Sequence, residues 1–487
     1  MRAVRPRVDM PDPGDARSFW LQEALSLREF AGVPCPPLTD KVAADVCIVG
    51  GGFAGMWSAW ELSEREPGMR VALLEADVCG GGASGRNGGF CSSSWWDLDG
   101  IVGLFGETEG VRYATAVSDE VAWIEGWCRD SGVDAWFHRD GMLGIKTGNW
   151  QTGFGRDGAF ELCERLGLRD RLRAVSAEQA RAFADSPRVL GGTSVPDGAI
   201  CHPARLARGI RRLLLERGVR IYERTRVSGV DRGRRAIVRA EHGAVRADQV
   251  VLTTGAWTAA WPGFRRSFGV IVDYCVATEP IPDRLAEIGW TTNVGLADGR
   301  DLLYYLRPTD DGRIVIGGGT TGVVYGGRLG RRVTHDRHVA ETAARGLLWL
   351  FPQLEGVRFT HAWGGPIDMT PSFLPFYRTL APGNVHAGLG FSGHGLTQTR
   401  LGARILASKV LGTHDEWSSM PVARSEIAKA PPEPFRFPMS KAAVMSLETG
   451  DRRQDEGRRR GAIRTLVGGA PLRYREILAA RASRLRA

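Results

Sequence analysis

The chain has 487 residues, of which 43% are hydrophobic and 24% are charged, and this composition is ordinary for a folded protein long enough for two domains. Its net charge of +9 comes almost wholly from arginine and is spread out, without the patch and groove-reading chemistry that nucleic-acid binding needs. No run approaches ~18 consecutive apolar residues and the N-terminus has no apolar signal region, so we expect neither integral membrane association nor secretion.

The eight cysteines are scattered singly along the chain, with no CxxC pair. None is spaced with the histidines in a pattern that would hold a metal ion, so we expect no metal site. Single cysteines suit a reducing compartment, and they predict a cytoplasmic protein. Residues 1–43 read as a proline-containing lead-in that Trp20 and Leu21 anchor to the rest of the chain.

A glycine-rich motif, ADVCIVGGGFAG, occupies residues 44–55. Its apolar first half predicts a short buried strand, and Gly50, Gly52 and Gly55 have the GxGxxG spacing of a dinucleotide-binding turn. In that spacing the first glycine allows a tight turn, the second lets backbone approach a diphosphate, and the third lets the next helix pack closely. That helix, predicted over roughly Ala54–Arg65, directs its N-terminus at the phosphates.

An acidic residue closes the second predicted strand. Arg70–Leu74 reads as this strand, and Glu75 follows in position to accept the hydroxyls of an adenosine ribose. We include the adjacent Ala76 among the cofactor-binding residues. An acid at this place argues against a 2′-phosphate and so against NADP, but the motif does not choose between NAD and FAD.

A second glycine-rich loop, GGGASGRNGGFC at residues 80–91, favours FAD. A nicotinamide domain has no need for such a loop directly after its second strand, whereas the longer flavin cofactor runs on past the first loop. Arg86 and Asn87 offer donors. The small residues permit a close approach to the ribityl-diphosphate and the flat ring: Gly82, Ala83, Ser84, Gly85, Gly88 and Gly89.

The middle of the chain changes its pattern and then returns to it. Residues 101–195 carry amphipathic helices such as Tyr113–Asp130, and a strand is predicted at Met142–Lys146. The first pattern resumes with a helix at His202–Arg217 and strands at Val219–Tyr222 and Gln249–Thr253. The last of these strands ends in a turn that brings backbone to the cofactor, at Thr254 and Gly255.

Strand-rich segments follow and predict an antiparallel sheet: Val270–Thr278, Leu302–Arg307 and Arg313–Gly318. The chain then returns a third time, with a strand at Asn384–Ala387 and a glycine loop, GLGFSGHG, at residues 388–395. We call residues 388–395 the late loop. A helix is predicted after it, at Leu396–Leu411.

These elements predict an α/β fold of two interleaved domains. The discontinuous, Rossmann-like FAD-binding domain comprises residues 44–100, 196–262 and 360–412, and an α+β substrate domain with the antiparallel sheet comprises 101–195 and 263–359. Residues 413–487 form a C-terminal extension with a proline-rich hinge. Its many arginines predict a solvated or loosely docked tail in preference to one that touches an anionic membrane.

Three motifs together, GASGRNGGF, LTTGAWT and GLGFSGHG, resemble the glycine/D-amino-acid oxidase (DAO) family of FAD-dependent amine oxidoreductases. The stretches at residues 303–318, 363–375 and 431–438 resemble its γ-glutamylputrescine oxidase-like branch. The resemblance covers nearly all of residues 18–460. It implies a glutathione-reductase-like fold of the DAO type, with FAD as the cofactor.

The resemblance also implies cofactor contacts at matching positions. The GxGxxG loop, with Phe53 and Ala54, would hold the diphosphate, and Glu75 would hold the ribose. Val227 would contact adenine through its backbone, and Gly255 would pass near the cofactor. The second loop would run toward the flavin through Ala83, Ser84, Arg86, Asn87, Gly88 and Gly89. The late loop would approach the pyrimidine edge through Gly390, Phe391, Ser392, Gly393, His394, Gly395 and Leu396.

Two departures from the family's pattern bear on the chemistry. Some relatives bind FAD through a cysteine shortly before the late loop, but this chain has Gly364 and Gly365 there, so we expect non-covalent FAD. Sarcosine-oxidising relatives use a lysine over the flavin to activate oxygen, and Val315 stands at that place. Oxygen and another electron acceptor therefore both stay open.

The inserted sheet supplies the expected pocket side chains, Tyr304, Tyr305 and Arg307. Arg307 would pair with a substrate carboxylate or phosphonate, or else form a structural ion pair, and both readings stay open. The tyrosines are expected to be half in the core and half in the pocket. His394, the one histidine in a cofactor loop, would either titrate or order the backbone beside the flavin.

The resemblance implies oxidation of the C–N bond of a small amine or amino acid. Hydride would pass to flavin N5, and the imine would hydrolyse to an aldehyde or keto product. Two alternatives stay open at this point. One is a catalytically silent flavin-binding protein of the same fold, and the other, which the second glycine loop disfavours, is an NAD-dependent dehydrogenase.

Overall fold

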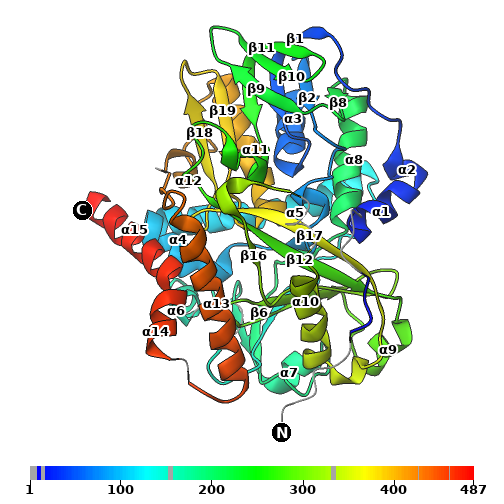
Figure 1. Ribbon diagram of the computed structural model, residues 1–487, viewed down its shortest axis with the longest axis vertical. Coiled ribbons are helices and arrows are strands. Elements are labelled where there is room, and N and C mark those ends of the chain that lie inside the picture. Colours follow the sequence, from blue (N-terminus) through cyan, green and yellow to red (C-terminus); the bar gives the residue numbers. More distant parts are fainter. Residues whose placement is uncertain are drawn as a thin grey trace.

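Two β-sheets organise the molecule, and Figure 1 shows them in the upper and lower halves of the view. The computed structural model describes residues 8–11, 17–151, 157–330, 336–425, 427–459 and 461–486. Within these ranges, every helix is too short or too polar to be a membrane-spanning segment. All eight cysteines are buried and carry free thiols.

The first sheet is mostly parallel. In spatial order its parallel strands are β19 (Val385–Leu389), β11 (Ala244–Leu252), β1 (Lys41–Val49), β2 (Val71–Leu74) and β8 (Arg220–Tyr222). β18 (Phe376–Leu380) closes one edge antiparallel to β19, and the hairpin of β9 (Val227–Asp231) and β10 (Ala236–Ala240) extends β11. Alternate residues of β1 and β2 enter two different core clusters, so both faces of the sheet are covered, as parallel strands require.

The helices that cover this sheet come from distant parts of the chain. α3 (Phe53–Arg65) follows β1 and packs against α8 (Pro203–Glu216) and α11 (Gly395–Leu411). α5 (Glu107–Ser131) packs on α11 and extends beyond the predicted helix at both ends. β1 is also longer than the short strand predicted, because its polar first half continues the parallel ladder with β11 from Lys41 onward.

The second sheet is mostly antiparallel. In spatial order its strands are β16 (Gly322–Val323), β12 (Gly269–Thr278), β15 (Ile314–Gly318), β14 (Tyr304–Pro308), β13 (Gly295–Asp298), β4 (Met142–Ile145), β6 (Gly192–Val195) and β5 (Arg173–Val175). β17 (Phe359–Met369) pairs with β12 along nearly its whole length, although residues 360–412 are assigned above to the cofactor domain. α10 (Arg337–Leu350) packs on one face of β12 and β15, and the other face carries side chains of the site described below.

The remaining elements are short or lie near the termini. Trp20 and Leu21 of α1 (Phe19–Ser26) are fully buried, which confirms the predicted anchor, and the indole of Trp20 donates to the carbonyl of Asn87 at 2.9 Å. β3 (Phe90–Cys91) and β7 (Ala199–Ile200) form a separate two-stranded ladder. The other helices are α2 (Arg28–Ala31), α4 (Leu98–Phe105), α6 (Asp157–Arg165), α7 (Ala177–Arg181), α9 (Pro282–Glu287), α12 (Pro421–Arg424), α13 (Arg436–Asp455), α14 (Ala462–Gly468) and α15 (Ala470–Arg486).

The C-terminal extension is helical and docked. Figure 1 shows α13, α14 and α15, coloured orange to red, along one side of the molecule beside α4 and α6. α15 packs against α4, and Arg475 on α15 is only 4% exposed. The prediction of a solvated or loosely docked tail is therefore wrong for this residue. Among the described residues of the extension, the exposed arginines are Arg424, Arg452, Arg458, Arg459, Arg473, Arg481 and Arg484.

Candidate active site

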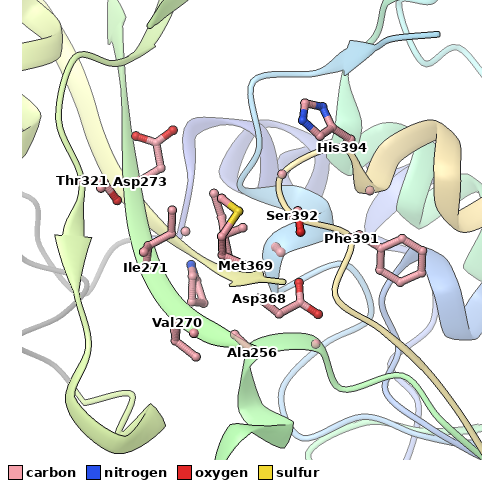
Figure 2. Close-up of a pocket in the computed structure, with 18 of the residues that line it drawn as sticks. Ala256, Val270, Ile271, Asp273, Thr321, Asp368, Met369, Phe391, Ser392 and His394 are labelled. Carbon is pink, nitrogen blue, oxygen red and sulfur yellow. The ribbon is translucent and has the colours of Figure 1, made fainter. Parts of the chain in front are cut away.

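A large cavity, with a volume of about 1660 Å³, is lined by both sheets and by the C-terminal helices. Its walls include the β1–α3 turn, the second glycine loop, the end of β11, one face of β12 and β17, and the late loop. Figure 2 shows the part of this cavity where β12 and β17 face the late loop. Stretches that are hundreds of residues apart in sequence therefore meet around one space.

The β1–α3 turn has the tight geometry that its glycines predict. Gly50 has a φ of +113°, and a methyl group on Gly55 would lie 1.9 Å from the carbonyl oxygen of Gly50. Gly52, Phe53 and Ala54 line the cavity at the start of α3, whereas Gly55 is covered by the turn and does not. Gly52 at the N-cap has no side chain, and of the first N–H groups only that of Phe53 has a side-chain acceptor, the hydroxyl of Ser84 at 2.8 Å. The other N–H groups of the first turn and the helix dipole favour an anion in the cavity.

Glu75 lies at the end of β2 and lines the same cavity, next to Ala76. One carboxylate oxygen accepts the N–H of Gly51 at 2.7 Å, and the other accepts the N–H of Asp77 at 2.9 Å. Burial raises the pKa of Glu75, and these two backbone donors act against that rise. The carboxylate is thus held in place between the two turns, as expected for a group that binds a ribose.

The second glycine loop is braced by its own polar side chains. The guanidinium of Arg86 donates to the carbonyls of Gly81 at 2.9 Å and Gly364 at 3.2 Å. Asn87 donates to the carbonyl of Ser84 at 2.9 Å and accepts the N–H of Gly89 at 2.8 Å. These side chains hold the loop's shape, so the backbone and the small residues are left to meet a ligand. The loop residues that line the cavity are Gly81, Gly82, Ala83, Ser84, Arg86, Asn87, Gly88 and Phe90.

Gly89 was expected in the cavity wall and does not lie there. Its φ is +79°, and a methyl group on it would lie 2.2 Å from the carbonyl oxygen of Cys201. The residue leads the chain into the β3–β7 ladder, and Cys201 donates its N–H to the Gly89 carbonyl at 2.8 Å. Gly89 therefore shapes the loop without contacting the cavity.

The late loop lines the cavity from Phe391 to Leu396. Gly390 does not line the cavity. Its N–H donates to Asp368 at 2.5 Å, and a methyl group added to Gly390 would lie 2.3 Å from the methyl carbon of Thr370. Ser392 has a φ of +52°, and its hydroxyl accepts the N–H of Thr370 at 3.1 Å. These bonds tie the loop to the end of β17, and α11 begins directly after it with its N-terminus at the cavity.

His394 lines the cavity and packs its ring against Trp96, with the ring centres 4.7 Å apart. Burial lowers the pKa of His394 to about 4, so the ring is neutral near pH 7. Its backbone N–H donates to the carbonyl of Phe391 at 2.9 Å. Two roles were open for His394, titration or ordering of the backbone, and a neutral, packed ring fits the second.

The end of β11 and the start of β9 complete the cofactor side. Val227, Thr254 and Gly255 all line the cavity, as predicted. The hydroxyl of Thr254 lies 2.6 Å from that of Thr258, and Gly255 has a φ of +51° at the start of a short turn of helix. This turn allows backbone from the first sheet to reach the same space as the glycine loops.

Of the three pocket side chains expected from the inserted sheet, only Tyr305 lines the cavity. Tyr304 points to the opposite face of β14, where a methyl group on Gly346 of α10 would meet its ring at 2.4 Å. The prediction of a pocket role for Tyr304 is wrong because successive residues of a strand face opposite sides.

Arg307 was also expected in the pocket, and this prediction is wrong as well. The side chain is fully buried beneath the second glycine loop and lies over the ring of Trp20, 5.2 Å from its centre. Its guanidinium donates to the backbone carbonyls of Cys201 and of Pro308, the latter at 2.9 Å. Arg307 thus has a structural role. It fills this role by bonding to backbone carbonyls and packing on an aromatic ring, and not through the ion pair that the second reading expected.

Asp273 on β12 is a cavity residue that the sequence reasoning missed. Its carboxylate accepts the hydroxyl of Tyr305 at 2.7 Å and the N–H of Tyr274 at 2.8 Å. Burial raises the pKa of Asp273 to about 6, and these hydrogen bonds act against that rise. One signal was available: a lone acid interrupts the apolar run of a predicted buried strand, Val270–Thr278.

Arg475 and Asp97 form a second missed feature, at the wall that the C-terminal helices supply. The two guanidinium nitrogens of Arg475 lie 2.6 Å from the two carboxylate oxygens of Asp97. Both residues line the cavity, and both side chains are buried. No pattern local to either residue could have predicted this pair, since 378 positions separate them.

The cavity's shape and chemistry fit FAD. Gly50 and Gly55 leave no room for side chains in the first turn, the start of α3 offers N–H groups to a diphosphate, and Glu75 stands at the far end for a ribose. The space continues past the second loop to the wall of β12 and β17, where a flat ring and a substrate would lie. Val315, at the place of the oxygen-activating lysine, is a buried apolar residue of β15.

Comparison with known proteins gives a consistent result. The family described as FAD dependent oxidoreductase (DAO) matches residues 45–409. A gamma-glutamylputrescine oxidoreductase of Escherichia coli (strain K12) is 30% identical over 399 residues, which cover 81% of this chain and 90% of the relative. A probable oxidoreductase OrdL of Haemophilus influenzae is 26% identical over 406 residues, covering 79% and 86% of the two chains.

Solved structures share the fold. Glycine oxidase from Geobacillus kaustophilus has a TM-score of 0.63 at 19% identity, covering 79% of this chain and 99% of its own. Iminodiacetate oxidase from Chelativorans sp. BNC1 has a TM-score of 0.61 at 20% identity, covering 80% and 100%. The predicted fold class is thereby confirmed. The helices α13–α15 lie beyond the residues that the family matches.

Proposed function

Because the chain belongs to the family of FAD-dependent oxidoreductases, we propose that it oxidises the C–N bond of a small amine or amino acid. The names of its relatives support this class of substrate, since they include a gamma-glutamylputrescine oxidoreductase and a glycine oxidase. The match to an FAD family also removes the NAD-dependent dehydrogenase from the alternatives.

One observation carries the proposal. The cavity runs without interruption from Glu75, past both glycine turns, to the wall formed by β12 and β17. A cofactor held at the first end would present its reactive ring at the second end, where Tyr305 lines the cavity and Asp273 lies opposite the late loop (Figure 2). When bound there, FAD supplies the hydride acceptor that converts the amine to an imine, which water hydrolyses to an aldehyde or keto product.

The chain's own residues would bind and orient the two reactants. Glu75 and the start of α3 would hold the ribose and the diphosphate of non-covalent FAD, since Gly364 and Gly365 offer no thiol. The N–H groups of the late loop and the start of α11 would stabilise negative charge at the pyrimidine edge of the ring. The sheet wall and the C-terminal helices would exclude water from the substrate's reacting carbon.

The experiment that tests this function is an anaerobic panel of amines and amino acids added to the purified holoenzyme. We expect a yellow protein whose flavin absorbance bleaches with one or a few members of the panel. Re-oxidation with oxygen and with a quinone-like dye would then identify the electron acceptor. A protein that holds FAD and is bleached by no member of the panel would favour the catalytically silent alternative.

A further inference from the structure

Along β12, the row of side chains that faces the cavity places one carboxylate between apolar and neutral neighbours. On β12 the odd-numbered residues face the cavity, so Ile271, Asp273 and Cys275 lie in a row. Across the ladder to β17, Asp273 pairs with Gly365 and Ile271 pairs with Ile367. Because the residue opposite Asp273 is a glycine, no side chain from that position of β17 covers the carboxylate, and both residues line the cavity.

The partners of this carboxylate are all neutral. Tyr305 donates its hydroxyl and Tyr274 its N–H, while Gly318 contributes a further backbone hydrogen bond. Within the described part of the chain, no arginine, lysine or histidine pairs with Asp273. A carboxylate has about four acceptor sites, so three neutral donors leave room for one more.

Three other carboxylates in the cavity wall are already engaged. Asp97 is paired with Arg475 through both oxygens, and Asp298 with Arg300 at 2.7 Å. Asp368 accepts the N–H of Gly390, and Figure 2 shows it beside the late loop while Asp273 lies across the pocket with Thr321. Asp273 differs from Asp97 and Asp298 because it has no cationic partner. It differs from Asp368 because it does not bond to the late loop.

Asp273 is also linked to the cofactor side through Tyr305. A methyl group on Gly88 of the second glycine loop would lie 2.6 Å from the Tyr305 ring, so this ring packs directly on the loop. The same tyrosine donates its hydroxyl to Asp273. The carboxylate therefore stands one side chain away from the loop that would run toward the flavin.

We propose that Asp273 binds the ammonium group of the substrate and accepts its proton. In this step one N–H bond of the ammonium breaks and one O–H bond forms on the carboxylate, without any change of oxidation state. The inference rests on the proposed function and adds a requirement to it: the substrate is a primary or secondary amine that enters as a cation. The step matters because only the neutral amine has the electron pair that assists loss of hydride from its carbon.

Physical reasons favour the transfer at this place. Burial raises the cost of both charges, so moving the proton removes an ammonium and a carboxylate from a low-dielectric cavity together. The raised pKa of Asp273 makes it a better proton acceptor than a solvated aspartate. The neighbouring titratable groups, Tyr305 and Cys275, have pKa values that burial raises, so both stay protonated. Arg86, the nearest cation on the loop packed against Gly365, is directed at the carbonyls of Gly81 and Gly364.

The test compares Asp273→Asn with Asp301→Asn, a matched control that removes another cavity-lining carboxylate outside the β12 wall. Both variants are purified as holoenzymes, and their FAD content is read from the visible spectrum. The amine that bleaches the wild type fastest is titrated anaerobically, and its alcohol isostere is titrated through its perturbation of the flavin spectrum.

We expect Asp273→Asn to bind the amine about 10- to 100-fold more weakly, the effect of losing a charged hydrogen bond, with the alcohol affected less than about threefold. In this variant the rate of bleaching should rise with pH toward the pKa of the free amine, because only solvent can then remove the proton. The control should behave as wild type in both respects.

Two outcomes would count against the inference or its premise. Unchanged amine affinity and an unchanged pH profile in Asp273→Asn overturn the inference and leave the oxidase function standing. A wild type bleached by no amine overturns the proposed function, and the inference with it. If the asparagine variant holds no FAD, Asp273→Ser is measured in its place and judged by the same two readouts.

Discussion

The glycine turns and the C-terminal helices line the same cavity, but they are held in place by different kinds of interaction. The turns depend on short-range steric contacts, such as that between Gly55 and the carbonyl of Gly50. The C-terminal wall depends on a buried ion pair between residues 378 positions apart, Asp97 and Arg475. The comparison indicates that the cofactor end of the cavity is specified locally, whereas the closure of its other end is specified by tertiary contacts.

Gly55→Ala tests the local half and should have the greatest effect. The new methyl group would lie 1.9 Å from the Gly50 carbonyl oxygen and 2.8 Å from the Thr253 hydroxyl, both in a tight turn. We expect a loss of roughly 3 kcal/mol or more in the free energy of unfolding, together with loss of bound FAD. Chemical denaturation and flavin content measure the two effects. Gly68→Ala is the control, since nothing lies within 4 Å of its added methyl group.

Arg475→Met tests the tertiary half. It leaves Asp97 as a buried carboxylate without its cation, and loss of one partner from such a pair costs about 3 kcal/mol. The cost should appear as opening of α15, measured by faster hydrogen exchange in residues 470–486, while FAD stays bound. The control is Arg481→Met, which removes an exposed arginine of the same helix. Release of FAD from Arg475→Met would show that the two halves of the cavity are not separable.

The role of Asp273, on the β12 wall of the cavity, can be tested through the pH dependence of amine binding. Asp273 must be ionised to receive a proton, and its raised pKa of about 6 sets the limit. Amine affinity should therefore be constant above pH 6 and fall about tenfold for each pH unit below it, because protonation removes the acceptor. Anaerobic titrations between pH 5 and pH 8 measure this dependence, and in Asp273→Asn the fall below pH 6 should be absent.

The smallest effect is expected from the braces of the second glycine loop. Asn87→Ala removes one hydrogen bond from the loop's own N–H group and two to its carbonyls. Since these groups can in part be hydrated, we expect about 1 kcal/mol of lost stability, seen as a lower thermal midpoint of the holoenzyme. Asn149→Ala, at an exposed turn, is the control. Equal midpoints for the two variants would mean that the brace contributes nothing.

Much of the fold was predictable because its signals are short-range. Glycine spacing, buried apolar strands and the acid at Glu75 each lie within a few residues of the element that they determine. The face of a strand is harder to predict: Tyr304 and Tyr305 are adjacent and equivalent in composition, but only one meets the cavity. Arg307 shares the face of Tyr305, and only the packing of a distant loop over it removes it from the site.

The C-terminal wall could not be predicted for a different reason. Arg475 is one of many arginines in the tail, and its local surroundings do not differ from those of Arg473 or Arg481. What distinguishes it is the position of Asp97 after folding, which no local pattern contains. Asp273 is an intermediate case, since an acid inside an apolar strand was visible in the sequence, but its neutral partners were not.

The docking of α15 has a consequence for the order of events during synthesis. α15 leaves the ribosome long after its contact, α4, because the two helices span residues 470–486 and 98–105. The three stretches that build the first sheet and its covering helices are complete by residue 411, so a nascent chain can enclose FAD before α15 exists.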